Sequence, residues 1–273
     1  MTGKIPRWKD AIMFNTPRKR LKGLSFNKLI PNILTMLALC AGMTSIKFGL
    51  EEKWDTAVIC LVIASVLDSL DGRIARALRG TSKFGAELDS LSDFICFGVS
   101  PAFLLYIWTM KESGPVGWIL ILLFCVCCAL RLARFNTNID SPESPSWTKL
   151  FFSGVPAPAG AGLVLFPMII SFQTDLEYVR EPPFVALIIL ITSALLVSQL
   201  PTYSFKTLRI QHRFILPTML SVGLVAALTV TAPWLTLTII IIIYIVSFPF
   251  SWRSYRKHAA KVITRNNNKD NHE

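Results

Sequence analysis

Four aspartates lie inside stretches that are otherwise apolar enough to cross a membrane. They form two pairs, Asp68 with Asp71 and Asp89 with Asp93. An uncompensated carboxylate in hydrocarbon costs several kcal/mol, so such groups persist where they meet cations, water or a substrate. These four side chains are therefore the starting point for predicting the chemistry of the chain.

The spacing within each pair places both carboxylates on one face of a helix. Residues three or four apart along an α-helix lie about one turn apart on the same side. The link between the pairs, from Arg76 to Gly85, is short enough to make the two helices antiparallel neighbours. We therefore expect all four carboxylates to converge.

Adjacent carboxylates repel one another unless a cation compensates them, and hard divalent cations prefer oxygen ligands. We expect one or two Mg²⁺ or Mn²⁺ ions at this cluster. The small residues Gly72, Ala75 and Gly85 allow a phosphate-bearing ligand to approach the helix backbone. Arg76, one turn beyond Gly72, can reach the same phosphates. A substrate with a pyrophosphate linkage is predicted.

The composition indicates that these residues belong to a membrane protein. Of the 273 residues 52% are hydrophobic and 16% charged, and the mean hydropathy is +0.51, which is too apolar for an ordinary soluble domain. Apolar runs of about 20 residues predict an all-α, polytopic fold with eight transmembrane helices. These spans cover residues 30–49, 55–77, 88–109, 116–135, 155–173, 183–200, 214–231 and 234–251.

The basic residues predict the orientation. The net charge is +11, and the eight spans place 24 of the 28 Lys and Arg residues on one face. The other face receives Lys47, Lys53, Lys111 and Arg180. The positive-inside rule then puts both termini and the aspartates at the cytoplasmic side.

The two ends of the chain are polar. Residues 1–28 alternate basic and apolar side chains and predict a helical arm lying on anionic lipid; the alternative is a disordered basic tail that only fixes topology. Residues 29–252 form the predicted transmembrane domain, and residues 253–273 a disordered basic tail. No recognition motif accompanies the basic residues, so nucleic-acid binding is not expected.

The pattern D-x-x-D-G-x-x-A-R-x8-G-x3-D-x3-D is complete from Asp68 to Asp93 and resembles the CDP-alcohol phosphatidyltransferase family. Three further segments are similar to one branch, the membrane-integral phosphatidylserine synthases. They are Ser92–Pro101, Arg131–Asn136 and Phe152–Pro158. The resemblance implies transfer of a phosphatidyl group from CDP-diacylglycerol to the hydroxyl of L-serine, which yields phosphatidylserine and CMP.

The resemblance also implies roles for single residues. Asp68, Asp71 and Asp89 would hold the metal ions, and Asp93 would join them and act as general base. Residues that would bind CDP-diacylglycerol are Gly72, Ala75, Arg76, Ser82 and Gly85. Homodimers and a bacterial inner membrane are expected from the family alone.

Two arginines near the end of the fourth span suit the acceptor. Arg131 and Arg134 are three residues apart and followed by Asn136, and a guanidinium can bind the serine carboxylate with two hydrogen bonds. Alternatively, both arginines are positive-inside anchors that reach the lipid head groups.

The residues leave the reaction path and the acceptor open. Transfer could proceed by direct in-line attack or through a phosphatidyl-enzyme intermediate on an aspartate. The acceptor could also be glycerol 3-phosphate, an inositol phosphate or choline. A secondary transporter would use intramembrane carboxylates differently, near the bilayer midplane between repeated halves.

Two prolines, Pro156 and Pro158, break the start of the fifth span. They could open a lateral slot for acyl chains, or form an ordinary helix-packing surface with the nearby glycines.

Overall fold

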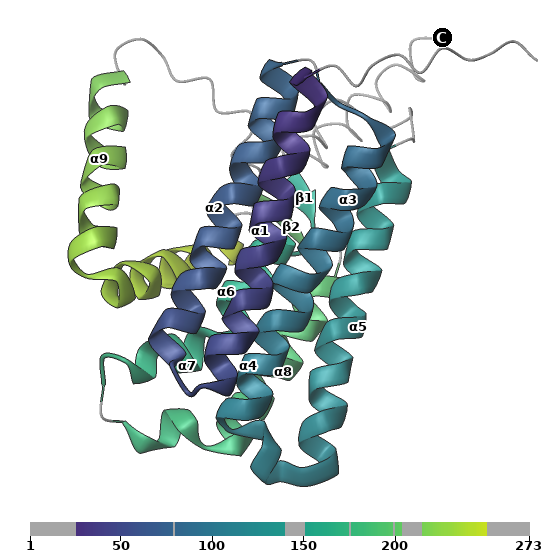
Figure 1. Cartoon of the computed structure of the whole chain (residues 1–273). Coiled ribbons are helices and arrows are strands. Elements are labelled where there is room, and N and C mark those ends of the chain that lie inside the picture. The colour runs from purple at the N-terminus through teal and green to yellow at the C-terminus, as the bar shows by residue number, and fades with distance from the viewer. Residues whose placement is uncertain are drawn as a thin grey trace, which may run out of the picture.

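A computed structural model describes residues 26–78, 80–139, 151–174, 176–198, 200–203 and 215–249. These residues are helical apart from one small sheet (Figure 1). The elements in chain order are α1 (Phe26–Leu50), α2 (Trp54–Ala77), α3 (Lys83–Asp93), the π-helix η2 (Phe94–Val99), α4 (Ser100–Trp108), the 3₁₀-helix η3 (Met110–Ser113), α5 (Gly114–Ile139), β1 (Phe151–Ser153), α6 (Ala157–Val164), α7 (Phe166–Ser171), the 3₁₀-helix η5 (Glu177–Arg180), α8 (Pro182–Val197), β2 (Pro201–Tyr203) and α9 (Ile215–Thr231). A further apolar helix covers Pro233–Pro249.

Helices occupy all eight predicted spans, although the fifth is divided between α6 and α7. Three helical stretches in the described part of the chain are long and apolar enough to cross a membrane. They are Leu29–Leu50, Lys83–Trp108 and Met110–Thr137. The apolar helical character is confirmed, and the number of crossings stays a prediction.

Helix α1 packs along α2 as an antiparallel hairpin and also contacts the helix formed by α3, η2 and α4 (Figure 1). The second contact is close because it is made at a glycine. A Cβ on Gly42 would lie 2.5 Å from the Cys96 Sγ atom, and the Ser100 hydroxyl donates to the Gly42 carbonyl at 2.9 Å. Small residues and interhelical hydrogen bonds of this kind hold membrane helices together, so these contacts fix the register of α1 against η2 and α4.

The buried core lies between α2, η2, α4, α5, α6 and α8. Its largest fully buried side chains include Phe97, Leu104, Phe124 and Ile189. By contrast α9 stands apart from the bundle in Figure 1, and its apolar side chains, such as Leu216 and Val230, are largely exposed. Of the two helices that carry the aspartates, α2 therefore borders the core, whereas α3 contributes only Ser92 to the buried residues.

The small sheet was not predicted from the sequence. Strands β1 and β2 are antiparallel, with Phe151 opposite Tyr203 and Ser153 opposite Pro201. Strands of three residues are too short to produce a recognisable alternation of polar and apolar positions. The turn after β1 uses Gly154 at φ +80°, and a Cβ there would lie 2.7 Å from the Ser198 carbonyl oxygen. Glycine is therefore required where this turn meets the end of α8.

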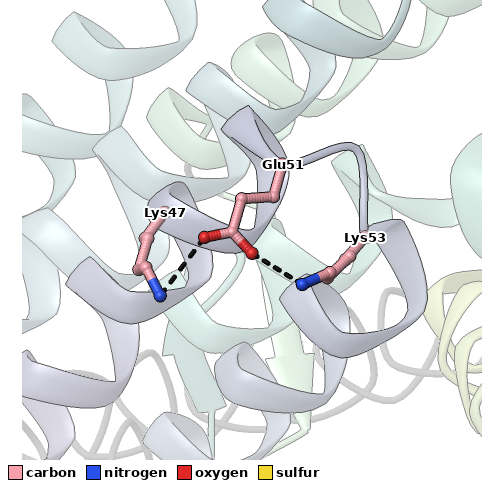
Figure 2. Close-up of polar contacts among 3 residues, drawn as sticks. All are labelled: Lys47, Glu51 and Lys53. Carbon is pink, nitrogen blue, oxygen red and sulfur yellow. Dashed lines mark hydrogen bonds and ion pairs between the residues drawn. The ribbon is translucent and has the colours of Figure 1, made fainter.

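The link between α1 and α2 carries a closed group of charges (Figure 2). Glu51 accepts from Lys47 at 3.2 Å and from Lys53 at 2.8 Å. Both ammonium groups also lie within 6 Å of the centre of the Phe48 ring. The hydrogen bond from Lys53, followed by that from Lys47, lowers the pKa of Glu51 below its ordinary value. This carboxylate is already compensated by the chain itself.

The predicted surface arm and basic tail lie outside the described residues. The exceptions are the last three residues of the arm, which begin α1 at Phe26.

Candidate active site

Helices α2 and α3 bring three of the predicted aspartates together. One carboxylate oxygen from each of Asp68, Asp71 and Asp89 lies within 4.8 Å of the others. Asp71 is buried and the other two are half-buried. The expected convergence of the two pairs is confirmed for these three residues.

The fourth aspartate, Asp93, lies one turn beyond Asp89 at the end of α3. Its carboxyl group lies beside that of Asp68. Its Oδ1 atom is buried and has no hydrogen-bond partner among the described residues. Because a buried oxygen without a partner is costly, this atom points to a cation or ligand that completes the site.

Within the described part of the chain, no lysine or arginine forms an ion pair with this cluster. Among the described residues, the ion pairs within 4 Å are those of Glu51 with Lys47 and Lys53, far along α1. Arg131 is near enough to interact electrostatically with Asp68 and Asp93. Several carboxylate oxygens at short mutual distance are the donor set of a hard divalent ion, so the residues present fit a metal site.

A pocket of about 180 Å³ opens beside the aspartates. It contains all five residues expected to bind CDP-diacylglycerol, together with two of the expected metal ligands. These are Gly72, Ala75, Arg76, Ser82 and Gly85, with Asp71 and Asp89. Six of the eight fixed positions of the sequence pattern therefore line one pocket, and Asp68 and Asp93 are not among its lining residues.

The start of α3 forms one wall of this pocket. Ser82 caps the helix, and its Oγ accepts from the Gly85 N–H at 3.0 Å. A Cβ on Gly85 would lie 2.8 Å from the Asn32 Oδ1 atom, so a larger residue at this position would displace the Asn32 side chain. Backbone N–H groups at a helix N-terminus favour negatively charged groups such as phosphate.

Helix α1 also lines this pocket, and its contribution was not predicted from the sequence. Pro31, Asn32 and Thr35 all line the pocket, and the Thr35 hydroxyl donates to the Asp71 Oδ2 atom at 2.5 Å. Asn32 and Thr35 are polar residues three apart within an apolar span. This is the same kind of signal that identified the aspartates, and it could have identified this pair as well.

The three residues expected to bind serine point to different neighbours. Arg134 donates to the carbonyl oxygens of Val197 at 2.9 Å and Ser198 at 3.1 Å, at the end of α8. Asn136 donates to the Ser90 Oγ atom of α3 at 2.9 Å.

Of the two arginines, Arg131 is the one beside the acidic cluster, and its guanidinium also stacks 5.8 Å from the centre of the Phe135 ring. Arginine side chains are long, so a shared helix face at the backbone does not bring their charged ends together.

The π-helix η2 begins immediately after Asp93 and includes the buried residues Cys96 and Phe97. Short π-helical turns inside α-helices are frequent at functional sites. This one lies within the segment Ser92–Pro101 that is similar to one branch of the family.

A second, apolar pocket of about 340 Å³ lies between α2, η2, α6 and the helix Pro233–Pro249. Pro158 and Gly162 line it. Gly160, between them, instead packs against Leu196, whose Cδ2 would lie 2.7 Å from an added Cβ. The segment of small residues thus serves as a pocket wall on one side and as a helix-packing surface on the other.

Comparison with known proteins agrees with this geometry. The chain is 38% identical to a CDP-diacylglycerol--serine O-phosphatidyltransferase of Mycobacterium leprae over 245 aligned residues. The alignment covers 90% of this chain and 81% of that protein. A Helicobacter pylori protein of the same name is 37% identical, covering 66% of this chain and 74% of that protein. An archaetidylserine synthase of Methanothermobacter thermautotrophicus is 31% identical, covering 63% of this chain and 68% of that protein.

Two family models match the chain. The model "CDP-alcohol phosphatidyltransferase" covers residues 28–199, and "CDP-alcohol phosphatidyltransferase 2" covers residues 213–249. The first match spans more than half of the chain and includes the aspartates, the pocket and both arginines. This protein therefore belongs to the CDP-alcohol phosphatidyltransferase family.

Proposed function

We propose that the protein transfers the phosphatidyl group of CDP-diacylglycerol to the hydroxyl of L-serine, forming phosphatidylserine and CMP. The observation that carries this proposal is the single pocket that unites the five expected nucleotide-binding residues with Asp71 and Asp89. The serine acceptor is favoured by the relatives named CDP-diacylglycerol--serine O-phosphatidyltransferase, which are similar over most of the chain.

Two Mg²⁺ or Mn²⁺ ions would be held by the aspartates. Asp68, Asp71 and Asp89 would bind one ion, because their oxygens already lie within 4.8 Å of one another. Asp93 would complete the second site with its unpaired Oδ1 atom. When bound, such ions neutralise diphosphate oxygens and stabilise the charge that develops on the reacting phosphorus and on the leaving CMP.

The pocket beside the aspartates would bind the nucleotide end of the lipid. Gly72 and Gly85 leave the helix backbone accessible to the diphosphate, and the capped N-terminus of α3 provides a favourable dipole. Arg76 would add a guanidinium to the phosphates. Ala75 and Ser82 would close the same surface.

The reaction itself requires removal of one proton. The serine oxygen would attack the phosphorus that bears diacylglycerol, and the bond from that phosphorus to the diphosphate bridging oxygen would break, releasing CMP. Asp93 would accept the hydroxyl proton, since its carboxyl group lies at the edge of the cluster beside Asp68. We favour this direct displacement over a phosphatidyl-enzyme intermediate on an aspartate. Inversion of configuration at phosphorus supports it, and retention would refute it.

Arg131 would bind the carboxylate of serine, because its guanidinium lies on the side of the acidic cluster. Arg134 and Asn136 would contribute to the same acceptor site by fixing α5 against α8 and α3. The apolar pocket at Pro158 and Gly162 would receive an acyl chain of the lipid substrate.

The proposed membrane topology is based on the distribution of lysine and arginine residues. We propose eight crossings of a bacterial inner membrane, with both termini and the active site in the cytoplasm and with the protein forming a homodimer. The arm over residues 1–28 would lie on the cytoplasmic membrane surface, residues 29–252 would form the transmembrane domain and residues 253–273 a basic tail.

The deciding experiment is an acceptor panel. Purified protein in detergent is incubated with CDP-diacylglycerol and Mn²⁺, and serine, glycerol 3-phosphate, inositol phosphate or choline is added separately. CMP release and a new phospholipid with serine alone support the proposal. Reaction with another acceptor would reassign the substrate. No CMP release without a sealed compartment would favour the transporter hypothesis instead.

A further inference from the structure

Thr35, in the third turn of α1, contacts both helices that carry the aspartates. Its hydroxyl donates to the Asp71 Oδ2 atom of α2 at 2.5 Å. Its backbone carbonyl accepts from the Ser92 hydroxyl of α3 at 3.3 Å. All three residues are buried, with 4% of Thr35, 5% of Asp71 and 4% of Ser92 exposed. Water therefore cannot readily replace these contacts.

The hydroxyl of Thr35 has one proton and two acceptors within reach. The Pro31 carbonyl oxygen lies at 3.1 Å, and the Asp71 Oδ2 atom is closer. A hydrogen bond from a hydroxyl to a carboxylate is short and about twice as strong as one to a neutral group. The proton is therefore directed to Asp71, which leaves the second carboxylate oxygen for another partner.

The position of Thr35 is itself well supported. The Cys96 thiol donates to the Ala38 carbonyl, one turn along α1, and the close approach of Gly42 to Cys96 follows one turn later. A β-branched side chain has few rotamers in a helix, and the rotamer of Thr35 places its Oγ1 atom beside the Asp71 carboxylate. Thr35 therefore presents its hydroxyl to Asp71 in one direction.

We propose that Thr35 is a positioning residue that aligns the Asp71 carboxylate for a divalent cation. This inference rests on the metal site of the proposed function and assigns to α1 a part in building that site. Partners of this kind orient metal ligands, and their loss commonly costs roughly 10- to 100-fold in metal affinity or activity.

The test measures the affinity of purified protein in detergent for Mn²⁺, without substrate. Electron paramagnetic resonance reports the concentration of free Mn²⁺ during the titration. Thr35→Val keeps the side-chain shape and removes the hydroxyl, and we expect it to weaken Mn²⁺ binding roughly 10- to 100-fold. Thr35→Ser restores the donor and should restore the affinity. If Thr35→Val does not yield folded protein, Thr35→Ala replaces it in the same measurement.

Thr44→Val is the matched control. Thr44 lies on the same helix, and its hydroxyl bonds to the Cys40 carbonyl at 2.6 Å on an exposed face. Its replacement should leave Mn²⁺ binding unchanged. The inference is overturned if Thr35→Val binds Mn²⁺ as tightly as the parent, if Thr44→Val weakens binding equally, or if the parent binds no Mn²⁺.

The same samples separate this inference from the proposed function. A parent protein that binds Mn²⁺ with the expected dependence on Thr35, but forms no phosphatidylserine, would refute the proposed reaction and leave the positioning role intact. A parent that forms phosphatidylserine, with unchanged Mn²⁺ affinity in Thr35→Val, would refute the positioning role alone.

Discussion

Helix α1 connects two groups of carboxylates that are compensated in opposite ways. At its end, the exposed Glu51 accepts from two lysines of the same chain (Figure 2). Near its start, Thr35 donates a hydrogen bond to Asp71. Among the described residues, no lysine or arginine lies within ion-pair distance of Asp71 or of its acidic neighbours. The helical rise puts these two places roughly 24 Å apart.

The difference separates a structural charge from a functional one. An exposed ion pair contributes little and weakens with salt, so the group at Glu51 needs nothing beyond the chain to be complete. Buried carboxylates without cations are costly unless something else binds them. Substitutions at the two ends of α1 should therefore have very different effects.

The largest effect is expected at the aspartates. Asp89→Asn, or Asp71→Asn, removes a charged metal ligand while keeping the side-chain shape, and should lower kcat/KM on the order of a thousandfold. CMP release from CDP-diacylglycerol and serine measures it. Glu51→Gln is the matched control at the other end of α1 and should retain activity. Full activity of Asp71→Asn would contradict the distinction between the aspartates and Glu51.

Removal of the metal should reproduce that loss reversibly. Treatment with EDTA should abolish CMP release, and added Mn²⁺ or Mg²⁺ should restore it, because hard divalent ions match the oxygen ligands of the cluster. The melting temperature of the parent should also rise on metal addition, and that of Asp89→Asn should not. Full activity in EDTA would contradict the metal site.

The two arginines of α5 should separate substrate binding from stability. Arg131→Lys loses bidentate recognition of a carboxylate and should raise the KM for serine about tenfold, with kcat largely kept. Arg134→Lys loses one of two bonds to the end of α8 and should lower the melting temperature instead. An unchanged KM for serine in both variants would eliminate the acceptor-site hypothesis.

The apolar pocket allows a finer test. Gly162 has ordinary space around it, since an added Cβ would lie 3.9 Å from Ile241. Gly162→Ala should therefore be tolerated, whereas Gly162→Leu should fill the pocket and raise the KM for long-chain CDP-diacylglycerol. A short-chain analogue should be affected less. Equal effects on both lipids would place the acyl chains elsewhere.

The smallest effect belongs to Glu51. Its two lysines lower its pKa in the folded protein, so its ionised form adds stability above the ordinary pKa of about 4.5. That stability is lost as the pH falls through the lowered folded-state value. The melting temperatures of parent and Glu51→Gln should converge at low pH and differ slightly at neutral pH in low salt. A difference that persists in acid would contradict this assignment.

Local spacing was sufficient to predict much of this site. Intervals of three and four residues correctly brought Asp68, Asp71 and Asp89 together, and the short link made α2 and α3 neighbours. Helical periodicity also located the apolar segments.

Contacts between helices that are far apart in the sequence could not be predicted in this way. Asn32 and Thr35 enter the site because α1 packs against α2 and α3. Two polar residues three apart in an apolar span mark this pair as unusual, but their spacing does not show which helices they contact. The direction of the Arg134 side chain and the sheet between β1 and β2 likewise depend on segments more than 40 residues apart.

The π-helix η2 connects Asp93 to the wall of the apolar pocket. It starts directly after Asp93, and its Phe97 forms part of the apolar cavity wall. If this pocket receives an acyl chain, as proposed, a chain that displaced Phe97 would also move the turn that follows Asp93, the proposed proton acceptor. The length and unsaturation of the acyl chain would then affect turnover as well as affinity.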